Sequence, residues 1–186
     1  SKYLLEHNGK KILVDCGLFQ GERELRERNW HDLPFDLDTL DAVIITHAHI
    51  DHTGFLPRLV NLGYRGPVFT SRATADLLKI LLPDSGRLQE EDADYRNRHQ
   101  LTRHTPALPL YDENDAKETL KLIQPVKNDG VAIDVCEDFR ASFLVAGHIV
   151  GASLVLVEMF NHSEYTTTSA EAAATPPKTG GELGTI

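Results

Sequence analysis

The stretch that decides the fold is Leu40–Gly54, LDAVIITHAHIDHTG. Its first half, LDAVIIT, is short, apolar and rich in β-branched residues, which is typical of a strand buried on both faces. Its second half gathers three imidazoles and a carboxylate in one short segment: His47, His49, Asp51 and His52. A buried strand that ends in such a cluster predicts a functional site at the edge of an α/β sheet.

The chemistry of this cluster indicates metal binding. Imidazole and carboxylate are the ligands that zinc and similar cations prefer. His47 and His49 lie two residues apart and can point to one metal position, while the following turn can carry Asp51 and His52 to a second. Two metals about 3.5–4 Å apart can act on both the attacking and the leaving oxygen of a displacement. The alternative is a surface loop that is rich in histidine by chance, but the density of ligands favours metal.

The sequence on either side predicts layered α/β organisation. Asn8-Gly9 indicates a tight turn, so Lys2–Asp15 is expected to form a hairpin. Ser71 can cap a helix, which we expect to end at Pro83. Further predicted elements are a loose helix over 21–30, short helices after Gly54, a charged helix over 87–102, a helix over 113–122, and strands over 67–70, 131–136, 139–145 and 153–159. Strands, then helices, then strands again predict a mixed sheet with helices packed on it.

Composition limits the remaining choices. The formal net charge of −9 argues against non-specific binding of polyanions. Cys16 and Cys136 lie far apart and are interpreted as buried, reduced thiols, which favours a cytoplasmic setting. We expect no membrane span, since no apolar run is long enough, and we see no secretory signal.

Several separate stretches together resemble one known family. THAHIDHTG is similar to the metal-binding signature of the metallo-β-lactamase superfamily. VDCGLFQG, DSGRLQEEDADYRNR, PLYDENDAKETLKLIQPV and AGHIVGAS resemble bacterial members of its β-CASP subgroup, the RNA-processing nucleases. The resemblance covers roughly residues 1–158. It implies an αββα layered fold that is incomplete here, with residues 1–159 as a partial metallo-β-lactamase-like domain and residues 160–186 as an irregular or disordered tail.

The resemblance also implies a role for each site residue. His47, His49 and His148 would hold one zinc ion, and Asp51 and His52 would contribute to a second. Asp51 and His52 are the expected catalytic residues, and Asp51 would also accept a proton. Asp15 would orient the histidine-rich loop through hydrogen bonds.

The function expected from these motifs is hydrolysis of RNA phosphodiesters by a metal-bound hydroxide. One alternative is hydrolysis of a small thioester, lactone or lactam by the same fold. Another is a truncated chain that turns nothing over and binds at most one metal, because the family's bridging aspartate and its late histidine find no counterpart in this sequence. RNA is the expected substrate and a homodimer one expected assembly, whereas the choice between endonuclease and exonuclease stays open.

Other charged and aromatic residues give weaker signals. A groove for phosphates could be lined by Arg87, Arg96, Arg98 and Arg103, with His99 and His104. Trp30 and Tyr95 could stack on bases. A solvated helix face for the charged residues and ordinary packing for the aromatic ones are the favoured explanations. We therefore assign no catalytic role to any of them or to the acidic residues between Glu90 and Asp94.

Overall fold

In the computed structural model, which describes residues 1–101 and 104–161, the first element is the predicted hairpin. Strands β1 (Tyr3–His7) and β2 (Lys10–Val14) pair antiparallel across Asn8-Gly9. Both turn residues have positive φ, 49° and 78°, as a two-residue turn of this kind requires. The turn predicted from two residues is thus confirmed.

The first sheet has five strands in the order β1-β2-β3-β4-β5. Strands β3 (Ala42–Ile44), β4 (Val68–Ser71) and β5 (Ile123–Val126) continue parallel to β2, so the sheet is mixed, as predicted. Strand β3 lies at the centre and all three of its residues are buried, which its apolar, β-branched sequence favours. Because β2 to β5 run in one direction, their carboxyl ends share one edge of the sheet.

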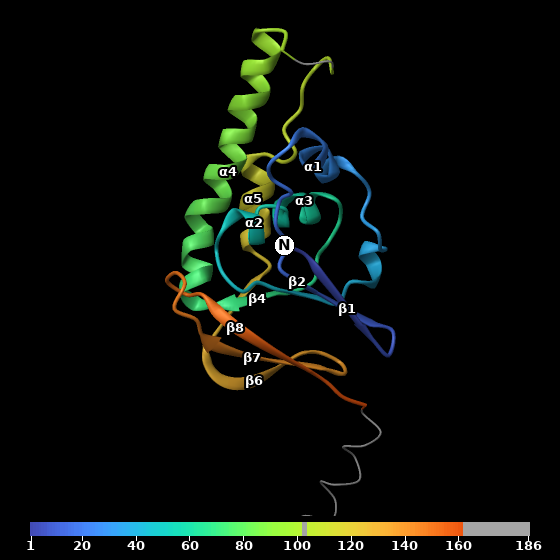
Figure 1. Cartoon of the computed structure of the whole chain (residues 1–186), viewed down its shortest axis with the longest axis vertical. Coiled ribbons are helices and arrows are strands. Elements are labelled where there is room, and N and C mark those ends of the chain that lie inside the picture. The colour runs from blue at the N-terminus through green and yellow to red at the C-terminus, as the bar shows by residue number, and fades with distance from the viewer. Residues whose placement is uncertain (102–103, 162–186) are drawn as a thin grey trace, which may run out of the picture.

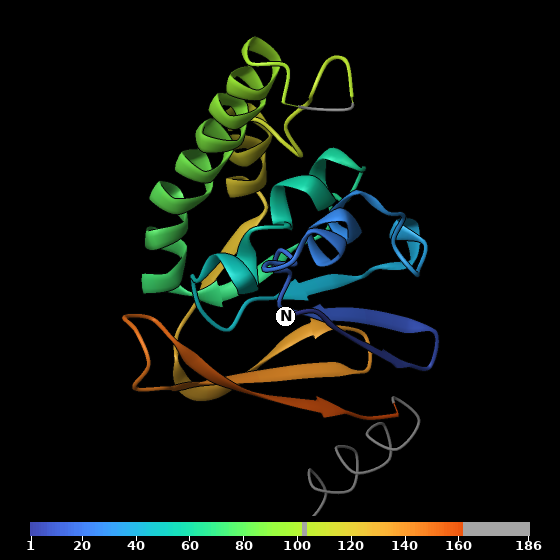
Figure 2. The same ribbon diagram turned by 45° about the horizontal axis from the view of Figure 1, so that its top comes forward.

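The second sheet consists of three antiparallel strands in the order β6-β7-β8. These are β6 (Asp129–Cys136), β7 (Phe139–Val145) and β8 (Ser153–Met159), close to the predicted ranges. The two sheets lie face to face (Figure 2). The core between them is apolar, built from Ile12, Ala42, Ile44, Phe69, Val135, Phe139, Ala141 and Phe143.

Helices cover the other face of the first sheet (Figure 1). Their core contains Leu13, Val43 and Val68 from the sheet and Leu56 and Leu59 from α3. The helices are α1 (Arg23–Glu27), η1 (Arg28–Trp30), η2 (Leu37–Thr39), α2 (Ile50–Thr53), α3 (Leu56–Asn61), α4 (Arg72–Arg98) and α5 (Glu113–Leu120). The described residues therefore form one helix layer on two stacked sheets, which confirms the predicted α/β class.

One prediction about the helices is wrong. The helix that begins at the Ser71 cap does not end at Pro83, and no separate helix begins at Arg87; α4 continues through both. Proline removes one backbone hydrogen bond, and here packing against α5 outweighs that loss. Gly86 makes the close approach possible, because a Cβ there would come 2.7 Å from the carbonyl oxygen of Asp112.

Three further expectations concern the cysteines, the membrane and the tail. Cys16 is fully buried as predicted, but Cys136 is only partly buried, at the end of β6. Within the described residues, no helix has the length and apolarity that a bilayer crossing requires. Residues 162–186 lie outside the described part of the chain, so the boundary between domain and tail after residue 159 stays a prediction.

Candidate metal centre

The candidate site lies at the edge of the first sheet that is formed by the carboxyl ends of the parallel strands β2, β3 and β4. Asp15 follows β2, the histidine-rich loop follows β3, and Ser71 ends β4. This edge is where open α/β sheets generally bind ligands, since the chain leaves the sheet there in loops. The buried apolar strands therefore fix the place of the polar residues that follow them.

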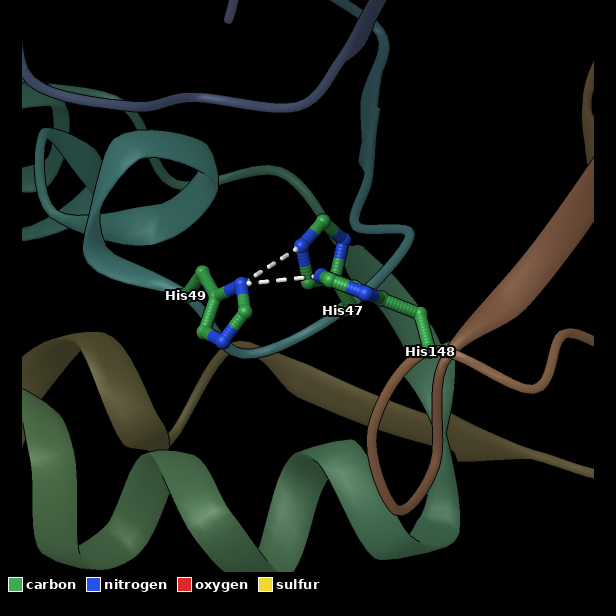
Figure 3. A group of neighbouring side chains, drawn as sticks. All are labelled: His47, His49 and His148. Carbon is green, nitrogen blue, oxygen red and sulfur yellow. Dashed lines mark hydrogen bonds between the residues drawn. The ribbon is translucent and has the colours of Figure 1, made fainter.

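Three histidines converge at this edge. His47 Nε2 lies 3.1 Å from His49 Nδ1, and His148 Nε2 lies 3.2 Å from the same His49 atom (Figure 3). One nitrogen from each ring lies within 4.8 Å of the other two. Nitrogens of a tetrahedral zinc site at 2.0–2.1 Å from the ion are roughly 3.3 Å apart, so this donor set fits such a metal.

Asp51 and His52 lie beside this trio rather than within it. The rings of His52 and His47 are 4.0 Å apart between centroids. His52 Nε2 lies 3.5 Å from Asp51 Oδ2, and the Asp51 side chain is about half exposed. The described residues thus give the first position three candidate ligands and a second position two, and the use of Asp51 and His52 for a second metal stays a prediction.

Asp15 contacts the loop that carries these ligands. Its buried carboxylate accepts hydrogen bonds from the Thr46 backbone N–H at 2.8 Å and from His52 Nδ1 at 2.6 Å. Its φ of 58° turns the backbone sharply after β2, a conformation that Asp tolerates better than most residues. An orienting role for Asp15 would act through these contacts, and that role stays a prediction.

The segment that carries His148 comes from the second sheet and is anchored to the first. The hydroxyls of Ser71 and Thr74, at the start of α4, donate to the Gly151 carbonyl oxygen at 2.6 and 2.9 Å. The Ser153 N–H donates to the Thr46 carbonyl oxygen at 2.9 Å. His148 reaches His49 because these bonds hold its turn against the loop.

His47 is buried, whereas His49 and His148 reach solvent. Burial lowers the pKa of His47 from its ordinary value, repulsion from His52 lowers it further, and Asp15 acts in the opposite direction. His47 is therefore neutral at pH 7 and keeps a lone pair for a metal.

The lowered pKa of His47 predicts a pH dependence of stability for the metal-free chain. As pH falls below about 6.5, the ordinary histidine pKa, the unfolded chain binds a proton at His47 before the folded chain does, so the folded state is disfavoured. The free energy of unfolding, from urea titrations, should fall between pH 6.5 and the lower folded pKa. This slope should become shallower in His47→Gln than in the unsubstituted chain and in His31→Gln, which removes an exposed imidazole instead. An equal slope in all three proteins would contradict the prediction.

The weaker candidates that the structure describes lie away from this site, whereas Arg103 lies outside the described residues. Arg96, His104 and Trp30 help to line a broad groove of about 1370 Å³ between α1 and α4. Arg96 is paired with Asp92, and Arg87 with Asp84 and Glu91, along the surface of α4. These pairs fit the interpretation of a solvated helix face.

The sequence reasoning did not single out Thr46. Its hydroxyl lies 2.9 Å from Asp15 Oδ1 and 2.9 Å from His47 Nδ1, so it contacts both. The sequence pointed to Thr46 only through its position, because it is the one residue with a hydroxyl between the buried strand and the first histidine.

Comparison with known proteins gives one family match and several relatives. Residues 2–64 match the model of the metallo-beta-lactamase superfamily. The chain is 34% identical over 159 residues to ribonuclease TTHA0252 of Thermus thermophilus, covering 85% of this chain and 32% of that protein. It is 35% identical over 152 residues to transcription termination factor FttA of Methanothermobacter thermautotrophicus, covering 81% and 22%. It is 28% identical over 160 residues to endoribonuclease ysh1 of Aspergillus fumigatus, covering 86% and 17%.

A solved structure supports the fold alone. BJP-1, a subclass B3 metallo-beta-lactamase of Bradyrhizobium japonicum, matches with a TM-score of 0.50 and 17% identity, over 86% of this chain and 51% of that one. The match to the metallo-β-lactamase superfamily covers residues 2–64, and the resemblance to its RNA-processing nucleases is confirmed by these relatives. It spans a third or less of the length of these curated relatives.

Proposed function

We propose that this chain carries the metal-binding part of a hydrolase that cleaves RNA phosphodiesters, with zinc as its metal. The observation that carries the proposal is the convergence of His47, His49 and His148, with Asp51 and His52 alongside, at the carboxyl edge of the sheet. The names of the relatives, a ribonuclease and an endoribonuclease, support RNA as the substrate.

Each residue has a role that its surroundings support. His47, His49 and His148 would hold one ion, and Asp51 and His52 would contribute to a second. A bound divalent ion would supply Lewis acidity, polarising a phosphoryl oxygen and making a nearby water more acidic. Asp51 is half exposed beside His52, where it can accept a proton from a water at the mouth of the site. Asp15 holds His52 and the loop in place.

The proposal includes a metal count. The described residues offer three ligands to one position and two to the other, and ligand number governs affinity. We therefore expect one tightly bound zinc per chain and a second site that stays weak. Elemental analysis of the folded chain, purified without a histidine tag, measures this count.

Cleavage of labelled RNA by the zinc-loaded chain, beside a chromogenic lactam and a thioester, tests the reaction. RNA cleavage that disappears in His49→Ala supports the proposal. Hydrolysis of the lactam or thioester without RNA cleavage would replace it with a small-molecule hydrolase. No activity on any substrate, with one zinc or fewer per chain, supports the third candidate: an incomplete centre whose catalysis needs more of the length that the relatives have.

A further inference from the structure

Thr46 joins three segments that are distant in sequence. Its backbone N–H donates to Asp15 Oδ1 at 2.8 Å, and its carbonyl oxygen accepts from the Ser153 N–H at 2.9 Å. Its hydroxyl oxygen lies 2.9 and 3.0 Å from the two Asp15 carboxylate oxygens and 2.9 Å from His47 Nδ1. The hydroxyl is therefore placed between a buried carboxylate and a candidate metal ligand.

The direction of these hydrogen bonds follows from counting protons. A hydroxyl has one proton to donate, and a carboxylate can only accept. The Thr46 proton must therefore go to Asp15, because otherwise the hydroxyl oxygen and the carboxylate oxygens would face each other without a proton between them. The Thr46 oxygen then accepts from His47, which requires the proton of that imidazole to sit on Nδ1.

This tautomer leaves His47 Nε2 with its lone pair. That atom is the one that faces His49, at 3.1 Å. The same carboxylate contacts His52 directly, since Asp15 Oδ2 accepts a hydrogen bond from His52 Nδ1 at 2.6 Å. This bond likewise places the His52 proton on Nδ1. A single buried carboxylate thus sets the tautomer of one histidine directly and of the other through a hydroxyl.

We propose that Thr46 is a positioning residue. Its hydroxyl links the Asp15 carboxylate to His47 through two hydrogen bonds, and so holds the His47 ring with Nε2 unprotonated and facing the metal position. This proposal rests on the proposed function, because it takes His47 to be a metal ligand. Partners of this kind fix the direction and tautomer of metal-binding histidines, and their loss typically weakens metal binding about 10–100-fold.

The test reads the tautomer in the metal-free full chain, so it does not depend on activity. Long-range ¹H–¹⁵N spectra of histidine-labelled protein at pH 8 distinguish Nδ1–H from Nε2–H, with His47 and His52 assigned from single His→Gln variants. We expect Nδ1–H at both residues in the unsubstituted chain. In Thr46→Val, which exchanges the hydroxyl for a methyl, His47 should shift toward Nε2–H while His52 stays unchanged. Thr46→Ser should restore the His47 signal, and Asp15→Asn should perturb both.

Zinc titration of the same proteins gives a second measurement. Thr46→Val should weaken the first zinc site about 10–100-fold, and Thr46→Ser should stay within a few-fold of the unsubstituted chain. Finding Nε2–H at His47 in the unsubstituted chain would overturn the proposal even if no variant folded. So would an unchanged His47 signal in folded Thr46→Val. Failure of every protein to bind zinc would instead count against the proposed function and leave the tautomer result standing.

Discussion

Replacing His49 with alanine is expected to lower the affinity of the chain for zinc by more than about 100-fold, the upper limit for losing a group that only orients a ligand. His49 is central to the histidine trio, because its Nδ1 lies within 3.2 Å of both His47 and His148. Without it, two imidazoles remain, which is fewer than the three protein ligands of an ordinary catalytic zinc site. Competition with a zinc chelator of known affinity measures the change.

A matched control separates loss of a ligand from loss of any histidine. His31→Ala removes an exposed imidazole that is not part of the trio and should leave zinc affinity unchanged. The unfolding transition of metal-free His49→Ala should stay close to that of the parent chain, since this ring reaches solvent. Zinc affinity within about tenfold of the parent, below the usual cost of losing even a group that only orients a ligand, would show that the trio is not the metal site.

Replacing Gly17 with alanine is expected to destabilise the chain by about 3–5 kcal/mol, at the upper end of the range for single substitutions. A Cβ at this position would overlap the backbone carbonyl of Asp51. The neighbouring backbone is tied to α2 as well, with Cys16 N–H donating to the His52 carbonyl at 2.7 Å and Phe55 N–H donating to the Cys16 carbonyl at 2.9 Å. Either these bonds break or the loop moves, because backbone cannot yield as a flexible side chain can.

Urea unfolding of the metal-free proteins measures this effect, with Gly147→Ala as control. A Cβ added to Gly147 would have no neighbouring atom within 4 Å, so this substitution should cost little. If Gly17→Ala folds, zinc affinity should also fall, since the displaced segment carries Asp51 and His52. A loss of stability below about 1 kcal/mol, the average for point substitutions, would contradict the prediction, because small backbone shifts would then suffice to relieve the close contact.

The elements that could be predicted from the sequence are those that neighbouring residues indicate by themselves. The Asn8-Gly9 turn needs positive φ at two adjacent residues, and few residue pairs supply it. The apolar stretch before Thr46 is short and rich in β-branched residues, which favours a buried strand. Strands β7 and β8 were likewise predicted over the residues that form them, because the mostly apolar stretches FRASFLV and SLVLVEM lie between turns.

The predictions that failed concern elements held by distant contacts. Pro83 would end an isolated helix, but α4 continues because Gly86 lets α5 pack closely against it. Strand β5 was not predicted, since Pro125 within it argues against a strand. It exists at the edge of the sheet, where proline is tolerated because no further strand needs its missing N–H.

The sequence alone determined the resemblance to the superfamily's metal-binding signature, the histidine-rich loop and the strand before it, because all of these lie within one continuous segment. It also named His148 and Asp15, through resemblance. Only the tertiary structure decided how these residues meet: His148 against His49 across 99 positions, and Asp15 against Thr46 across 31. The role of Thr46 depends on a carboxylate that the chain brings back from another strand, and such a contact has no period or spacing that a sequence could display.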